Sequence, residues 1–80
     1  MSNATAQNTT AAEHAIRRAA GMIRRVEREG FGRNCDATVR GIEYHLRTAQ
    51  QLLAKLDANP KRADRFADVL YRAEDLGIYL

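Results

Sequence analysis

The chain has few of the residues that stabilise small proteins through covalent bonds or metal ions. Its 80 residues include one cysteine, Cys35, which excludes an internal disulfide and any cysteine-rich zinc site. Its longest apolar runs are too short for a transmembrane helix, and its first residues lack the basic-then-apolar order of a secretory signal. We therefore expect a cytoplasmic protein.

Sequence motifs typical of catalytic or metal-binding sites are also missing. The sequence has no glycine-rich phosphate loop, no paired catalytic acids and no triad order. Cys35 and His45 would lie about 15 Å apart along one helix, too far to act as nucleophile and base. Neither His14 nor His45 has a suitable ligand three or four residues away. We expect no enzymatic activity, no cofactor and no metal, and we interpret Cys35 as a small core residue.

The composition that remains is that of a folded helical protein. Hydrophobic residues make up 45% of the chain and charged residues 29%. Disordered chains have fewer hydrophobic residues and a higher net charge, so we expect this chain to fold. A chain this short has a thin core and often gains stability by forming oligomers. Arginine far outnumbers lysine, which is typical of a high-GC bacterial or phage gene.

The first helix is predicted over residues 11–29, after a polar, disordered lead-in of residues 1–10. Thr10 and Glu13 have the spacing of a capping box at a helix start, and Gly30 is a suitable C-terminal cap. Apolar residues recur every three or four positions and predict one buried stripe: Ala12, Ile16, Ala19, Ile23 and Val26.

Two further helices are predicted over residues 35–58 and 60–76. Gly30 and Gly32 would reverse the chain before the second helix, which Asn34 or Asp36 would cap. Asn59-Pro60 would stop the second helix and start the third, and Gly77 would end the third, with Ile78 folding back on its last turn. The predicted second stripe is Cys35, Val39, Ile42, Leu46, Ala49, Leu53 and Leu56, and the third is Ala63, Phe66, Leu70 and Ala73, flanked by Val69 and Leu76.

Three helices with three stripes predict an all-α fold: one domain over residues 11–80, built as an antiparallel helical hairpin with a third helix against it, and oligomeric. A weaker line of mostly small residues runs beside the second stripe. It would form either a dimer face or the seat of the third helix: Thr38, Gly41, His45, Thr48 and Leu52.

The first helix has a basic face opposite its apolar stripe. At about 100° per residue, five arginines gather there, and the helix with its loop carries the whole net charge of +3: Arg17, Arg18, Arg24, Arg25 and Arg28. Gly21 on the same arc would leave a gap for a phosphate or a partner's backbone. The alternative is a merely solvated face, supported by a Glu13–Arg17 pair across one helical turn.

We expect a protein-binding module that acts as a regulator, inhibitor or assembly factor and self-associates. Its expected contact residues are these five arginines with Tyr44, Tyr71 and Tyr79, and the apolar tail from Ile78 to Leu80. The alternative is a nucleic-acid-binding protein that uses the arginine face, although the first helix has no aromatic residue for base stacking. Attachment to a membrane surface is less favoured, because the apolar stripe is rich in alanine.

Overall fold

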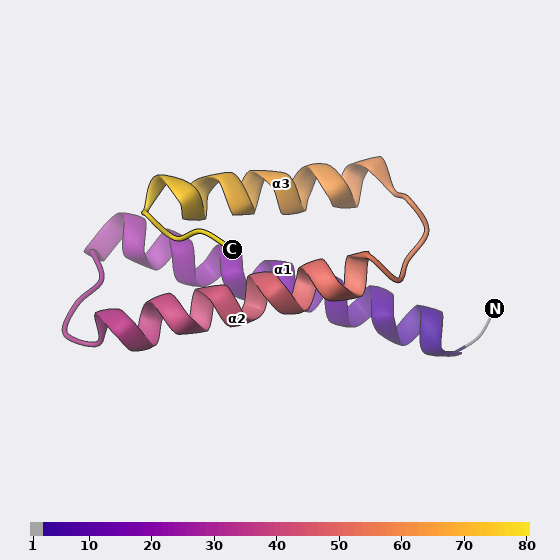
Figure 1. Ribbon diagram of the computed structural model, residues 1–80, viewed down its shortest axis with the longest axis horizontal. Coiled ribbons are helices and arrows are strands. Elements are labelled where there is room, and N and C mark those ends of the chain that lie inside the picture. The colour runs from indigo at the N-terminus through magenta and orange to yellow at the C-terminus, as the bar shows by residue number, and fades with distance from the viewer. Residues whose placement is uncertain (1–2) are drawn as a thin grey trace.

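A computed structural model describes residues 3–80, with side chains from residue 6 onward. These residues form three helices: α1 (Asn3–Glu29), α2 (Cys35–Leu53) and α3 (Pro60–Asp75). The two helices α1 and α2 pack closely as an antiparallel hairpin, and α3 lies against them with a smaller contact, made more with α1 than with α2 (Figure 1). This confirms the predicted all-α fold, with a helical hairpin and a third helix against it, while the oligomeric state stays a prediction. Within residues 3–80, no helix is long and apolar enough to cross a membrane.

The predicted start of the first helix is wrong. The helix begins at Asn3, so residues 3–10 are helical and do not form the disordered lead-in expected for residues 1–10, while residues 1 and 2 lie outside the described part. No proline or glycine interrupts residues 3–10, and extending a helix adds one hydrogen bond for each residue fixed. The capping-box residues Thr10 and Glu13 therefore lie inside α1, whose N-terminal end extends past α2 (Figure 1).

Glycines end α1 and reverse the chain as predicted. Gly30 has a φ of 81°, and its amide donates to the carbonyl of Val26 at 2.7 Å. Gly32 has a φ of 73°. Both lie in the left-handed region that favours glycine. Asn34 precedes α2 but makes no side-chain capping hydrogen bond.

The second helix ends at Leu53, five residues before the predicted end at residue 58. The amides of Lys55 and Leu56 donate to carbonyls three residues earlier, so the last turn tightens. No residue between Leu53 and Asn59 breaks a helix by itself. Residues 54–59 instead form the connection after which α3 runs back beside α1 (Figure 1).

Both ends of α3 follow local chemistry. The side chain of Asn59 accepts a hydrogen bond from the amide of Arg62 at 3.0 Å, and Pro60 occupies the first turn. At the other end, the amides of Gly77 and Ile78 donate to the carbonyls of Glu74 and Ala73, which is the Schellman arrangement. Ile78 folds back and is buried, as predicted.

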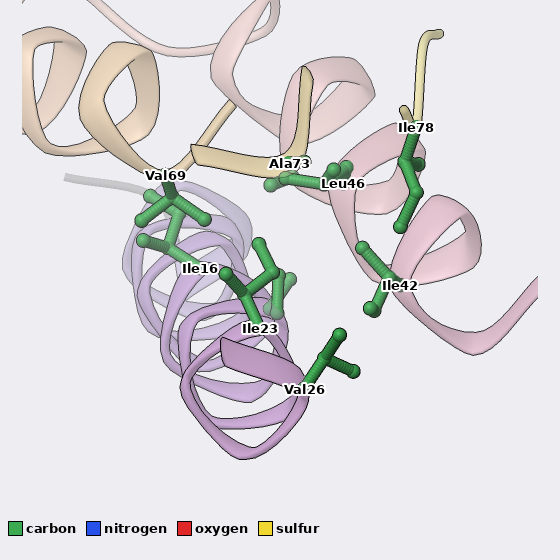
Figure 2. Close-up of a cluster of buried hydrophobic side chains, with 11 residues drawn as sticks. Ile16, Ile23, Val26, Ile42, Leu46, Val69, Ala73 and Ile78 are labelled. Carbon is green, nitrogen blue, oxygen red and sulfur yellow. The ribbon is translucent and has the colours of Figure 1, made fainter. Parts of the chain in front are cut away.

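All three helices contribute to one apolar core. Figure 2 shows Val69 of α3 above Ile16, and Ile78 beside Ile42 and Leu46 of α2. The predicted stripe of α1 is buried in full, and the centre of the α2 stripe is buried at Ile42, Leu46 and Ala49.

The prediction of a core position is wrong for two residues, Cys35 and Ala63, because both are exposed. Each lies at the N-terminal end of its helix. The periodic pattern continues to these ends, but the neighbouring helices do not cover them. Cys35 is therefore a surface residue, and α3 packs through Val69 and Ala73 in its C-terminal half.

Candidate interaction surface along α1 and α2

Two of the three glutamates of α1, Glu13 and Glu27, pair with arginines of α3. Arg72 donates hydrogen bonds to both carboxylate oxygens of Glu27, one of them from Nε at 3.2 Å. The bond from Arg72 lowers the pKa of Glu27, and the charges of Arg72 and Arg24 act in the same direction against the opposing effect of burial. Glu13 Oε1 lies 4.0 Å from Arg62 Nε. The Glu13 ion pair is therefore with α3 and not with Arg17, which the one-turn spacing had suggested.

Most of the arginines of α1 have no ion-pair partner among the described residues, although the charge of Arg24 acts on nearby Glu27. All five predicted arginines of α1 are exposed. Arg25 pairs with Glu29 at 3.1 Å. The other four have no carboxylate within ion-pair distance in the described part of the chain: Arg17, Arg18, Arg24 and Arg28. Two of the glutamates of α1 thus serve the α1–α3 contact, and the basic face keeps most of its positive charge.

The line of mostly small residues on α2 meets α1. A Cβ atom placed on Gly41 would lie 2.7 Å from Cε of Met22, so α1 occupies the space that the glycine leaves. His45, one turn further along α2, is close enough to Arg18 and His14 of α1 for their charges to affect its pKa. Gly41 and His45 border α1, so they are not the seat of the third helix. The alternative of a dimer face stays a prediction.

A shallow depression of about 400 Å³ lies where these residues meet. Arg17, Arg18, Arg25 and Gly21 line it from α1, together with Met22, and His45 closes it from α2. A Cβ atom on Gly21 would contact nothing within 4 Å, so the floor of the depression is open above this glycine. Three arginines and one histidine thus line one space.

The surroundings of His45 lower the pKa of its imidazole. Burial lowers the pKa of its imidazole most, and repulsion from Arg18 and then from His14 lowers it further. Its half-buried ring lies 5.3 Å from the ring of Tyr44, edge to face. Tyr44 is 66% exposed and therefore offers an aromatic surface beside the basic depression.

The eight predicted contact residues do not form one surface. The structure brings Arg17, Arg18 and Arg25 together around the depression, and His45 links it to Tyr44. Arg24 and Arg28 continue the basic face along α1. Tyr71 lies on α3 and Tyr79 in the C-terminal tail; both are exposed and belong to other faces. In that tail Ile78 is buried, so it is not a contact residue.

Sequence reasoning missed the position of His45 in this site. The spacing of α2 placed His45 beside the apolar stripe, but only the register of the hairpin places it opposite Arg18. Within residues 3–80, no group of three or more acidic, histidine or cysteine side chains could hold a metal ion.

Comparison with known proteins gives no relative: no protein-family model, no curated protein and no solved structure matches this chain.

Proposed function

We propose that the protein is a small helical interaction module that binds an acidic surface of another protein through the arginine face of α1. Such a module acts by docking, as a regulator, inhibitor or assembly factor, and its effect comes from occupying a partner's surface.

One observation carries the proposal: Glu13 and Glu27 of α1 pair with α3, and four exposed arginines of α1 have no carboxylate within ion-pair distance in the described part of the chain: Arg17, Arg18, Arg24 and Arg28. An unpaired arginine presents a planar donor fork that matches carboxylates of a partner. Several such forks on one rigid helix favour a complementary acidic surface and increase the rate of encounter.

The first test uses charge reversal on two helical faces. Arg17, Arg24 and Arg28 are replaced together by Glu, and the matched control replaces Lys55, Lys61 and Arg65 by Glu, which lowers the net charge equally. Lys55, Lys61 and Arg65 are exposed and unpaired within the described residues. Affinity purification from the native host should recover acidic proteins with the wild type and the control but not with the α1 variant. Equal recovery with all three would contradict the proposal.

A second candidate function is binding of RNA or DNA. Tyr44 supports it, because the exposed ring lies beside the basic depression and could stack on a base. Binding to phosphates would weaken steeply as salt rises. Retardation of RNA or DNA at physiological salt, lost in the α1 variant and without any captured protein, would favour this candidate over the first.

Self-association is a separate part of the proposal. Exposed Tyr71 and Tyr79, together with Leu80, provide apolar surface away from the arginine face, and a thin core benefits from further burial. Sedimentation velocity should show a dimer or larger species that Tyr71→Ser and Tyr79→Ser weaken. A monomer at all concentrations would remove this part and leave the arginine face unaffected.

A further inference from the structure

We propose that the depression between α1 and α2 binds a phosphate monoester, and that its occupant is a phosphorylated side chain of the partner. The residues that would bind it are Arg18, Arg25 and His45, over the open floor at Gly21. This inference rests on the proposed function and deepens it, because it names the chemical group that the arginine face recognises.

The geometry supports one compact anion. Arg17, Arg18 and Arg25 come from adjacent turns of α1, and His45 comes from α2, so basic residues of two helices line the space. Gly21 is helical, and a methyl group in place of its hydrogen would have no neighbour within 4 Å, which leaves room for a ligand to approach the helix backbone. A helix-interior glycine weakens a helix relative to alanine, and here it opens the depression.

The density of charge favours phosphate over a single carboxylate. Arg17 and Arg18 have no carboxylate partner within residues 3–80, and the pair of Arg25 with Glu29 is highly exposed. A carboxylate carries one negative charge, whereas a phosphate monoester carries close to two and offers three acceptor oxygens. The dianion can therefore satisfy several guanidinium groups at once.

His45 gives the site a spectroscopic reporter. The groups that face it from α1 are Arg18 and His14, with Arg17 and Arg25 around the same depression, and all of these are basic. On its own helix its ring neighbour is Tyr44. A bound dianion would offset the repulsion from Arg18 and His14, so the pKa of His45 should rise on binding.

The test follows the imidazole resonances of His45 by NMR while O-phosphoserine is added at constant ionic strength. We expect saturable binding, an upward shift of the pKa of His45, and about tenfold weaker binding in Arg18→Gln, because a charge-assisted hydrogen bond is lost. Arg65→Gln, an exposed arginine of α3, is the matched control and should bind as the wild type does.

The variant Gly21→Leu tests whether binding can be lost while the protein stays folded. Its side chain enters open space, and leucine favours a helix more than glycine does, so the midpoint of thermal unfolding should rise by a few degrees. The same side chain covers the floor of the depression above the helix backbone and should abolish binding. A Gly21→Leu variant that binds O-phosphoserine like the wild type would overturn the inference.

The remaining outcomes distinguish a phosphate monoester from a diester, and failure of the phosphate site from failure of the proposed function. Dimethyl phosphate, a monoanionic diester, should bind more weakly; equal binding would overturn the monoester assignment and favour a nucleic-acid backbone. If O-phosphoserine does not bind but capture of acidic proteins still depends on Arg17, Arg24 and Arg28, the phosphate site is wrong and the proposed function stands. If neither occurs, both fail.

Discussion

His45 lies half-buried beside two basic residues of α1, Arg18 and His14. These surroundings make the free energy of unfolding depend on whether His45 is protonated. Burial, then Arg18 and His14, lower the pKa of His45 below its ordinary value of 6.5. The unfolded chain keeps the ordinary value, so it takes up a proton more readily than the folded chain does. The free energy of unfolding should therefore be highest above pH 6.5 and should fall as the pH drops through and below this value.

This pH dependence belongs to His45 and can be removed with it. In His45→Gln, the decrease in the free energy of unfolding between about pH 7.5 and about pH 5.5 should be smaller than in the wild type. Urea denaturation at the two pH values, in a buffer without phosphate, measures the difference. An unchanged decrease in His45→Gln would show that another group is responsible. Glu27 titrates below this window, because Arg72 lowers its pKa.

The helices begin in chemically different ways, although an asparagine precedes both α2 and α3. The side chain of Asn59 accepts a hydrogen bond from the amide of Arg62, whereas that of Asn34 makes no capping bond. Such a bond satisfies an amide that has no partner within the helix. The two asparagines therefore form a natural pair for measuring the contribution of one cap to one element.

We expect Asn59→Ala to lower the free energy of unfolding by about 1 kcal/mol, the usual contribution of an asparagine cap. Asn34→Ala, the matched control, should lower it by a few tenths of a kcal/mol at most, since no side-chain bond is lost. Urea denaturation of both variants measures the difference. Equal losses would show that the hydrogen bond of Asn59 does not stabilise α3.

At the scale of the whole molecule, the C-terminal tail closes the core that the three helices build. Ile78 is 2% exposed and packs in the same cluster as Ile42 and Leu46 (Figure 2). The neighbouring Tyr79 is 66% exposed. The Schellman turn at Gly77 places these two consecutive side chains in different environments, so one residue of the tail contributes to folding and the next is left on the surface.

Ile78→Ala should lower the free energy of unfolding by about 2–5 kcal/mol, because a buried isoleucine leaves a cavity. Tyr79→Ala should change it by less than about 0.5 kcal/mol. If Ile78→Ala does not fold, Ile78→Val, with an expected loss of about 0.5–1.5 kcal/mol, keeps the comparison measurable. A loss in Tyr79→Ala as large as that in Ile78→Ala would contradict this arrangement of the tail.

The sequence by itself determined the three helices, the buried stripe of α1, the centre of the α2 stripe and the caps at Gly30, Asn59 and Gly77. These features depend on residues within a few positions of one another. Helical periodicity records which face is apolar, and turn chemistry records where a backbone amide or a positive φ needs a particular side chain. Local sequence therefore contains enough information to predict them.

Only the tertiary structure decided three features: the end of α2, the pairing of Glu13 and Glu27 with α3, and the position of His45 beside Arg18. Each of these depends on residues far apart in the chain, brought together by the register of the hairpin and the position of α3. The periodic pattern gives the direction of a helix face but not its partner. The pairing of Glu27 with Arg72, for example, spans 45 positions, a separation at which sequence spacing carries no geometric information.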